Sequence, residues 1–382
     1  MAPPINYTSE VSRQEECLAL LPAGYNFPLF NTKQALLSQR SSGYKNTALA
    51  AREIVDNGVE AGATRIDVVL QRPLQNRKKH QPRESVTDIA FIDNGSGMLP
   101  IMARYALSWG GGTHFNEHDF IGKFGFGLPN ASINQTRKVS VFTKTETAKK
   151  ITRVTLDIDK FSSFEHQSIP EPVEDDLPAF VTNYMKDNDL TFDHGTVVVW
   201  HDPDQLSYRK AGPLRDLIID DFGAAYRNFL DRVTIMVDRT KVEKVDPLFL
   251  DPSSRLYLPE EKNGAKEQHN RTIPVMYIYD KETGSKHLRK IDDEADLESD
   301  DYDVLSQGNI QVIVARFPVG FAVHKKGKKG FNDANRRFAV RQTRRGMCFV
   351  RAGREIETLD AFPRGANDES SGLGNGSSQS TS

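Results

Sequence analysis

The chain has 382 residues, which is enough for two domains of ordinary size, each with its own hydrophobic core. Hydrophobic residues make up 38% and charged residues 27%, a balance typical of a globular protein in water, and the net charge of −2 shows no overall preference for nucleic acid. No apolar run approaches the ~20 residues of a transmembrane helix, and residues 1–7 lack the pattern of a signal peptide. We therefore expect a cytoplasmic protein with no membrane partner.

The first elements follow a pattern of alternating helices and strands. Residues 1–30 contain prolines and mixed polarity and are expected to form an arm. Apolar residues at helical spacing predict a helix over about 45–61, and β-branched runs predict strands at 65–70 and 88–92. A helix is expected over about 98–109, before a glycine-rich region. Further strands are expected at 138–143, 151–156 and 196–200.

This order predicts an α+β fold, in which a mixed sheet carries helices on one face. Beyond it, an amphipathic helix over 213–233 precedes a strand at 233–237, and later strands are expected at 307–317 and 346–350. The serine- and glycine-rich end is typical of a disordered tail. It is compatible with a native tail and with a longer protein that continues into an effector region. The predicted parts are an arm (1–30), a first domain (31–205), a second domain (206–362) and a tail (363–382).

Neither a disulfide framework nor a zinc site is indicated, because Cys17 and Cys348 lie far apart without paired-thiol spacing.

Charged residues are unevenly distributed along the chain. Residues 292–303 hold eight acidic side chains, whereas 324–354 hold eleven lysines and arginines against the single acid Asp333. The basic stretch is a candidate surface for a polyanion, and a solvated loop is the ordinary alternative.

Two segments offer polar groups for a ligand. Glu53 and Asn57 lie four residues apart in the first predicted helix, so both side chains share one face. A carboxylate there can accept a proton from water, and an amide oxygen suits Mg²⁺. Asp93 ends a predicted strand and enters a turn with Gly95, Gly97 and Met98, which permits close approach to a planar ligand. An acidic helix face and a plain Asp-Asn-Gly turn are the ordinary alternatives.

A glycine loop follows, with the sequence Gly-Lys-Phe-Gly-Phe-Gly at 122–127. Its backbone N–H groups could cradle phosphates, and a helix around 130–134 would present its positive end. A Rossmann fingerprint is excluded, because the loop does not follow the first strand of a βαβ unit. Thr196, in His-Gly-Thr at 194–196, is also an ordinary β-branched strand residue.

In this order, the four segments resemble the motifs of the GHKL ATPases, the superfamily of DNA gyrase B, Hsp90, histidine kinases and MutL. Residues 44–64 look most similar to MORC-like proteins and their bacterial relatives. The resemblance implies a Bergerat-type ATP-binding sandwich over the first domain, with a transducer domain of ribosomal S5-like α/β fold after it. It also implies a hinged ATP lid around Trp109 to Phe115, with His114 and His118 on its surface.

The resemblance implies a role for each site residue. Glu53 polarises the attacking water, Asn57 holds Mg²⁺, and Asp93 binds the adenine amino group, which Thr196 also reaches. Leu128-Pro129 replaces a lysine that MORC proteins often carry after the last glycine, so that phosphate contact does not transfer. The remaining residues of the implied nucleotide site are Gly95, Gly97, Met98, Gly122, Lys123, Phe124, Gly125, Phe126 and Gly127.

The transducer is expected to supply a cation to the γ-phosphate. Gln342 and Arg344 resemble a gyrase pattern of glutamine and lysine two residues apart, with arginine in place of the lysine. Arg344 is the candidate from this pattern, and Lys325 of the basic stretch is the other first candidate. Others are Lys326, Lys328, Lys329 and Arg345.

These features predict a Mg²⁺-dependent ATPase that acts as an ATP-gated homodimeric clamp, with DNA as its client in compaction or defence. Such a protein would be nucleoid-associated or nuclear. The alternative is an Hsp90-like chaperone or interaction module with a protein client. A histidine kinase is less favoured because no phosphoacceptor helix pair precedes the motifs, and a topoisomerase would need a cleavage domain.

Overall fold

The computed structural model describes residues 32–41, 43–72, 85–109, 126–160, 168–321 and 333–359. The chain forms two compact units. Unit 1 comprises Met1–Val245 together with Ala352–Arg354, and unit 2 comprises the rest. The predicted domain boundary at residue 205 falls inside unit 1. No helix among the described residues is long and apolar enough to cross a bilayer.

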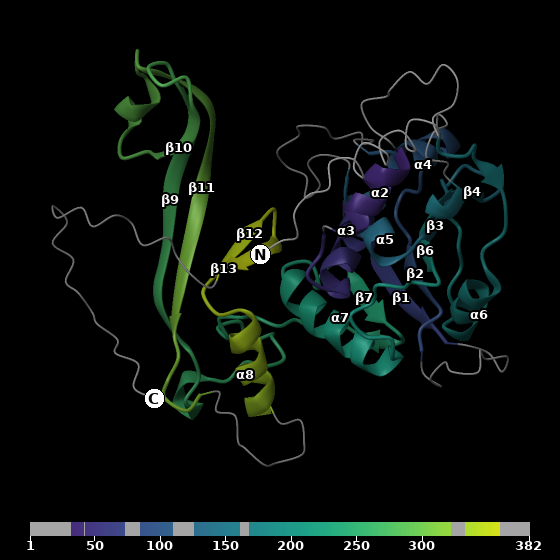
Figure 1. Cartoon of the computed structure of the whole chain (residues 1–382). Helices are drawn as coiled ribbons and strands as arrows, with labels where there is room; N and C mark the ends of the chain where they lie inside the picture. The colour runs from purple at the N-terminus through teal and green to yellow at the C-terminus, as the bar shows by residue number, and fades with distance from the viewer. Residues whose placement is uncertain are drawn as a thin grey trace, which may run out of the picture. The chain divides into compact units, whose positions relative to one another are not determined.

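In the described part of unit 1, eight strands form one mixed sheet in the order β5-β4-β3-β6-β2-β1-β7-β8 (Figure 1). Neighbouring strands are antiparallel, except that β1 pairs with β7 in parallel. The predicted strands are confirmed, with small shifts at their ends. The bounds are β1 Arg65–Gln71, β2 Asp88–Asp93, β3 Lys138–Lys144, β4 Thr152–Asp157, β5 Val173–Glu174, β6 Gly195–His201, β7 Thr234–Val237 and β8 Thr240–Lys241.

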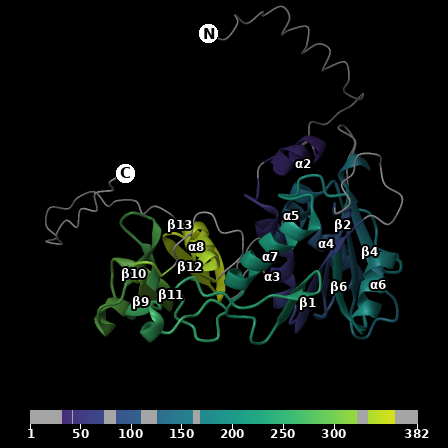
Figure 2. The same ribbon diagram turned by 90° about the horizontal axis from the view of Figure 1, so that it is seen from below.

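One face of this sheet packs against several helices around the largest core cluster of the unit. Figures 1 and 2 both show α3 and α7 on the same side of β1 and β2. Trp200 and Phe222 are completely buried in this cluster. Among the residues that the structure describes, the helices of unit 1 on this side are α2 Thr32–Ser41, α3 Thr47–Glu60, α4 Pro100–Ala106, α5 Gly127–Gln135 and α7 Ala211–Ala225.

The other face carries α6 (Ala179–Asp187), so the prediction that helices cover only one face is wrong. Val181, Tyr184 and Met185 lie at helical spacing and pack against the sheet residues that point away from α3. Because the central strands are buried on both faces, their sequences are nearly continuous apolar runs rather than alternating ones. This mixed sheet with helices fits the GHKL ATPase fold.

The predicted helix near residue 45 is confirmed as α3, which begins at Thr47 because Asn46 caps it. The Asn46 side chain accepts a hydrogen bond from the N–H of Leu49 at 2.9 Å. The predicted helix over 213–233 is shorter than expected. As α7 it ends at Ala225, and the chain continues in turns before β7.

Unit 2 is built around a long antiparallel pair, β9 (Lys266–Asp280) with β11 (Tyr302–Arg316), and β10 (Lys286–Lys290) adds to β9. Its buried cluster contains Met276, Ile278 and Tyr302. The strand predicted at 307–317 is the second part of β11. The S5-like α/β layer remains a prediction. The other elements are α8 Asp333–Thr343 and the hairpin strands β12 Met347–Arg351 and β13 Arg354–Leu359.

Candidate active site

Helix α3 presents Glu53 and Asn57 on one face, as predicted from their spacing. Glu53 is half-buried and Asn57 is exposed. Gly127, the first residue of α5, lies against Glu53, since a Cβ added at Gly127 would be 2.5 Å from Oε2 of the carboxylate. The end of the predicted glycine loop and the predicted base are therefore neighbours, and a side chain at residue 127 would displace the Glu53 carboxylate.

Burial raises the pKa of Glu53, because a carboxylate loses hydration when it leaves water. The positive charges of Arg354 and Arg52 lower it, and Glu60 raises it. A carboxylate with a raised pKa is a better proton acceptor when it is ionised. The environment of Glu53 therefore suits a general base.

Asp93 ends β2, and its carboxylate is held by two backbone N–H groups. Oδ1 accepts hydrogen bonds from Gly95 at 2.9 Å and from Thr196 at 3.3 Å. No hydrogen bond from the described residues reaches Oδ2, so this oxygen can accept one from a ligand. Burial raises the pKa of Asp93 to about 6, and the bonds from Gly95 and Thr196 oppose that rise.

Two glycines shape the turn beside Asp93. Gly97 has a φ of +67°, and a Cβ there would lie 2.1 Å from the carbonyl oxygen of Lys144. Gly195 has a φ of +124°, and a Cβ there would lie 2.0 Å from the carbonyl oxygen of Asp93. Because only glycine fits both the conformation and the space, Gly97 lies directly against the β3 backbone at Lys144 and Gly195 against the backbone of Asp93.

Thr143, on β3, links the turn to Thr196 and was not identified from the sequence. Its Oγ1 accepts a hydrogen bond from the N–H of Met98 at 2.8 Å and donates one to the carbonyl of Gly195 at 3.1 Å. The hydroxyls of Thr143 and Thr196 are 3.3 Å apart. The register pairs Thr196 with both Thr143 and Asp93, so three adjacent strands end at this site.

His194 also joins the site, with its Nδ1 2.7 Å from the carbonyl oxygen of Gly95. A carbonyl only accepts, so Nδ1 carries the proton. This contact connects the turn that follows β2 to the residue that precedes β6.

A buried ionic cluster on α3 was likewise missed by sequence reasoning. The guanidinium of Arg354 binds Asp56 with Nη2–Oδ2 at 2.7 Å and Nε–Oδ1 at 3.1 Å. The Tyr226 hydroxyl lies 2.8 Å from Oδ1 of Asp56. Burial raises the pKa of Asp56 to about 7, whereas Arg354 and the Tyr226 hydrogen bond lower it. Asp56 lies within the Glu-x-x-Asp-Asn segment, but nothing local marks Arg354.

The candidate transducer cations differ in their surroundings. Arg344 forms an ion pair with Glu355 in unit 2, with Nε–Oε1 at 3.0 Å and side chains only 9% and 3% exposed. Arg337 and Arg341 stack on the rings of Phe321 and Phe317. Arg345 is exposed. Much of the described part of the basic stretch is therefore engaged within the protein.

Several predicted site residues lie outside the described residues. These are Gly122, Lys123, Phe124 and Gly125 of the glycine loop, the hinge glycines, His114, His118, Lys325, Lys326, Lys328 and Lys329. Of that loop the structure describes Phe126, which precedes α5 and is 41% exposed, and Gly127.

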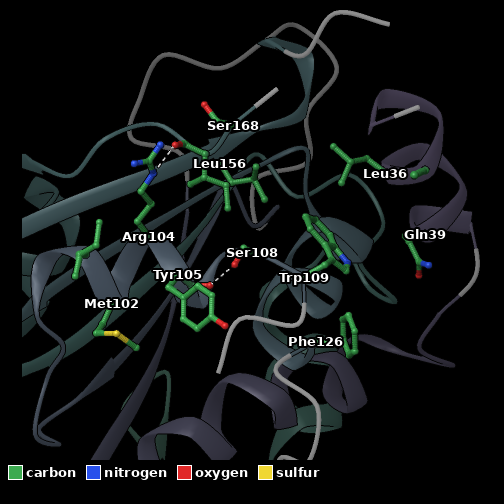
Figure 3. Close-up of a pocket in the computed structure, with 13 residues that line it drawn as sticks. Leu36, Gln39, Met102, Arg104, Tyr105, Ser108, Trp109, Phe126, Leu156 and Ser168 are labelled. Atoms are coloured by element: carbon green, nitrogen blue, oxygen red, sulfur yellow. Dashed lines mark hydrogen bonds between the residues drawn. The ribbon is translucent and has the colours of Figure 1, made fainter. Parts of the chain in front are cut away.

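A cavity of about 970 Å³ lies beside this site, between α2 and α4 (Figure 3). Its lining is mostly apolar and includes Leu36, Met102, Trp109 and Phe126. Phe126 is the only predicted nucleotide-site residue among the described residues that lines it; Glu53, Asn57, Asp93 and Thr196 do not.

The described residues contain no group of three or more His, Cys, Asp or Glu side chains that could hold a metal. Mg²⁺ in nucleotide sites usually needs only one or two protein ligands, with phosphates and water completing the shell. The exposed amide oxygen of Asn57, one helical turn from Glu53, fits that chemistry.

Residues 44–196 match the family model of the histidine kinase-, DNA gyrase B- and HSP90-like ATPases. The match begins just before α3 and ends at Thr196, so it contains every described residue of the predicted nucleotide site. This ATPase-like domain supports the resemblance to the GHKL superfamily and suggests ATP binding and hydrolysis. Among curated proteins, none matches the chain.

Proposed function

We propose that the chain binds Mg²⁺·ATP and hydrolyses it to ADP and phosphate. The observation that supports this most directly is the contact between Glu53 and Gly127, because it joins the predicted base to the end of the predicted phosphate loop. Glu53 would accept a proton from the water that attacks the γ-phosphate. We thus assign hydrolysis to Glu53 and to the glycine loop that ends at Gly127, which lie side by side.

In the proposed site, Asp93 binds the adenine end of ATP. Its Oδ1 is occupied by backbone N–H groups, and its Oδ2 is left to accept a hydrogen bond from the adenine amino group. Asn57 would hold Mg²⁺, which when bound neutralises developing negative charge on the phosphates. Gly95, Gly97, Met98 and Thr196 would form the walls around the base.

The test is phosphate release by the purified chain with ATP and Mg²⁺, compared with the same reaction in excess chelator. We expect slow turnover that requires the metal. A well-folded protein that binds no nucleotide at millimolar ATP with Mg²⁺ would overturn the proposal, whatever its client.

For the whole protein we propose an ATP-gated homodimeric clamp of the MORC-like type, with DNA as client. The basic stretch 324–354 supports this, since clustered cations attract phosphates. Lys325 and Arg344 remain the candidates for the cation that reaches the γ-phosphate, and Arg344 would have to leave Glu355 to do so. A DNA client would place the protein at the nucleoid or in the nucleus.

A protein client, as for an Hsp90-like chaperone, is the second candidate. It is favoured by the internal engagement of Arg337, Arg341 and Arg344, which leaves fewer cations for DNA. Fluorescence anisotropy with labelled duplex DNA separates the two. A DNA clamp should lose about 10³-fold in affinity between ~50 and ~200 mM salt, whereas no binding at either salt concentration favours the protein client.

A further inference from the structure

The long ribbon of unit 2 has one strand edge without a partner. Strand β11 pairs with β9 along one side, and no strand among the described residues pairs with its other side (Figure 1). Strand β10 pairs with β9 only over residues 275–279. The rest of the ribbon, 266–274 with 309–316, therefore has two strands, and an isolated two-stranded ribbon is marginally stable in water. A further strand at the free edge of β11 would stabilise it.

The two outer edges of this ribbon differ in their protection against strand addition. The edge of β9 carries Lys266, Glu267, Arg271 and Pro274, and charged residues and proline are the usual means by which an edge strand avoids pairing. Strand β11 has an irregularity near each end, and residues 306–314 between them contain no charged residue and no proline. A long uncharged edge is a template for another strand. The edge of β11 is therefore the side on which a strand can add.

The same part of β11 exposes apolar side chains. Ile310 and Val314 are 42% and 43% exposed. Together with Val312 they alternate along the strand, so the three side chains share one face. Ile310 lies opposite Ile273 of β9, and the apolar stripe therefore crosses both strands. A second ribbon beside β11 would widen this stripe, which three or more strands need for independent stability.

Gly308, next to the middle of β11, has no conformational reason to be glycine. Its φ is not positive, and a Cβ added there would meet nothing within 4 Å. Glycine in the interior of a strand lowers its stability, and it is typical of a place where another backbone approaches closely. The open space at Gly308 is therefore consistent with a partner strand beside the centre of β11.

The two ends of β11 carry charges of opposite sign. Its start belongs to the segment 275–303, which holds ten acidic residues against four lysines and arginines. It ends at Arg316, and Arg337 and Arg341 of α8 stack on the two phenylalanine rings that follow. Two β11 strands in antiparallel order would place each acidic end beside the basic end of the other copy, whereas parallel order would place like charges together. The strand is therefore complementary to a second copy of itself.

We propose that β11 pairs antiparallel with β11 of a second copy of this chain, so that the two ribbons form one continuous sheet. A twofold axis near Gly308 brings the opposite charges together by symmetry, whereas an unrelated strand would need the same order of charges by coincidence. The pairing uses unit 2 alone and none of the nucleotide-site residues. It therefore needs no ATP, and it is a second interface beyond the proposed ATP-gated clamp.

The area of this interface sets its strength. Nine residues of paired edge span about 30 Å. One pair of edge strands buries less than the ~1,600 Å² of a standard interface. We therefore expect a weak dimer, with a dissociation constant on the order of 10–100 µM.

The experiment is sedimentation equilibrium of the full chain without nucleotide, over protein concentrations from about 1 to about 300 µM. The average mass should rise from that of a monomer toward that of a dimer. Asn309→Lys with Gln311→Lys puts like charges close to the axis on both copies, which should weaken the association at least ~10-fold. A monomer throughout the range, or an unchanged dimer in this variant, would overturn the proposal.

Asn270→Lys with Thr272→Lys is the matched control. Thr272 lies opposite Gln311 in the same ribbon, and Asn270 accepts a hydrogen bond from Gln311 at 3.0 Å. Both double variants therefore lose the same contact and add two positive charges, but the control places them on β9. It should dimerise like the unmodified chain, and equal weakening in the two variants would contradict pairing through β11.

A disulfide test covers the case in which the lysine variant does not fold. Asn309→Cys, in a chain with Cys17→Ser and Cys348→Ser, places one thiol on each copy near the axis. Opposite residues of antiparallel strands have Cα atoms about 4.5–5.5 Å apart, which is within the range of a disulfide. Mild oxidation should therefore cross-link Asn309→Cys, and Thr272→Cys in the same background should stay monomeric. Equal cross-linking of the two variants would overturn the proposal.

The two kinds of dimer can be told apart by concentration and nucleotide. At about 1 µM the β11-paired dimer has dissociated, so a dimer that an ATP analogue induces there reports on the clamp alone. The Asn309→Lys, Gln311→Lys variant should still respond to the analogue at that concentration. Loss of the response would show that β11 belongs to the ATP-gated interface and would overturn its assignment as a second one.

Discussion

Asp93 on β2 and Thr196 on β6 are paired across the sheet, and the Thr196 N–H donates to Oδ1 of Asp93 at 3.3 Å. This pairing turns the Asp93 carboxylate so that its backbone bonds occupy one oxygen only. The predicted adenine contact at Asp93 and Thr196, 103 residues later in the chain, are therefore parts of one structure.

Asp93→Asn should weaken ATP binding by about 10- to 100-fold, because a hydrogen bond to a charged group contributes roughly 1.5–3 kcal/mol. Isothermal titration calorimetry with Mg²⁺·ATP measures the change. Asp88→Asn, at the opposite end of β2, is the control and should bind ATP normally. Unchanged affinity in Asp93→Asn would remove Asp93 from the adenine contact.

ATP affinity should fall as the pH is lowered through about 6, where the buried Asp93 carboxylate takes up a proton. The ionised form is the stronger acceptor for the adenine amino group, so protonation weakens the bond. Binding should therefore release protons near pH 6, and calorimetry in buffers of different ionisation enthalpy detects this. Affinity that is constant between pH 5 and 7 would contradict the assignment.

The raised pKa of Asp93 also predicts that the stability of the ligand-free protein depends on pH. The pKa of Asp93 rises from 3.8 in the unfolded chain to about 6 in the folded one. The folded state then binds more protons in that interval, so stability should decrease as the pH rises from about 4 to 6, on the order of 3 kcal/mol for this group. Denaturant titrations should show a flatter pH dependence for Asp93→Asn than for the unmodified chain.

Glu53→Ala should abolish hydrolysis and keep ATP binding, since a positioned base commonly contributes 10²- to 10⁴-fold in rate. Phosphate release and calorimetry on the same sample separate the two effects. Glu60→Ala, at the end of the same helix, is the matched control and should retain turnover. A Glu53→Ala enzyme with normal turnover would exclude Glu53 as the base.

Gly97→Ala should reduce stability and ATP binding together, because the new Cβ would collide with the Lys144 carbonyl at a φ of +67°. Gly62→Ala is a close control, with a φ of +76° and nothing within 4 Å of the added atom. Both variants carry the penalty of about 1–2 kcal/mol for alanine in the left-handed conformation, and only Gly97→Ala adds the clash. Equal melting temperatures for the two would show that the close approach at Gly97 is unimportant.

A non-hydrolysable ATP analogue should shift the chain from monomer toward dimer in light scattering if the clamp proposal holds. The Glu53→Ala variant should form the same dimer with ATP itself, since it binds without hydrolysis. A monomer under both conditions would remove dimerisation from the proposal and leave the ATPase chemistry untouched.

Much of the fold was predictable because its signals are local. The apolar spacing of α3 and the β-branched runs of β1, β2, β3 and β6 specify each element within a few residues. Helix α8 was missed, since its arginine-rich sequence resembles a solvated loop. Helix α6 was not predicted from the sequence, and for this reason the second covered face of the sheet was missed. Even a recognised amphipathic helix would not have shown which surface it covers.

The sequence by itself determined the site groups that lie within one segment: Glu53 with Asn57, and Asp93 with its glycine turn. Only the tertiary structure decided the partners of those groups, namely Gly127 beside Glu53, Thr143 beneath the turn, and Arg354 on Asp56, 298 residues away along the chain. The physical reason is that backbone periodicity and turn chemistry act over a few residues and leave a pattern in the sequence. A buried ion pair depends instead on how distant segments pack, and an arginine at the first residue of a strand has the same local sequence whether or not it lies against a carboxylate.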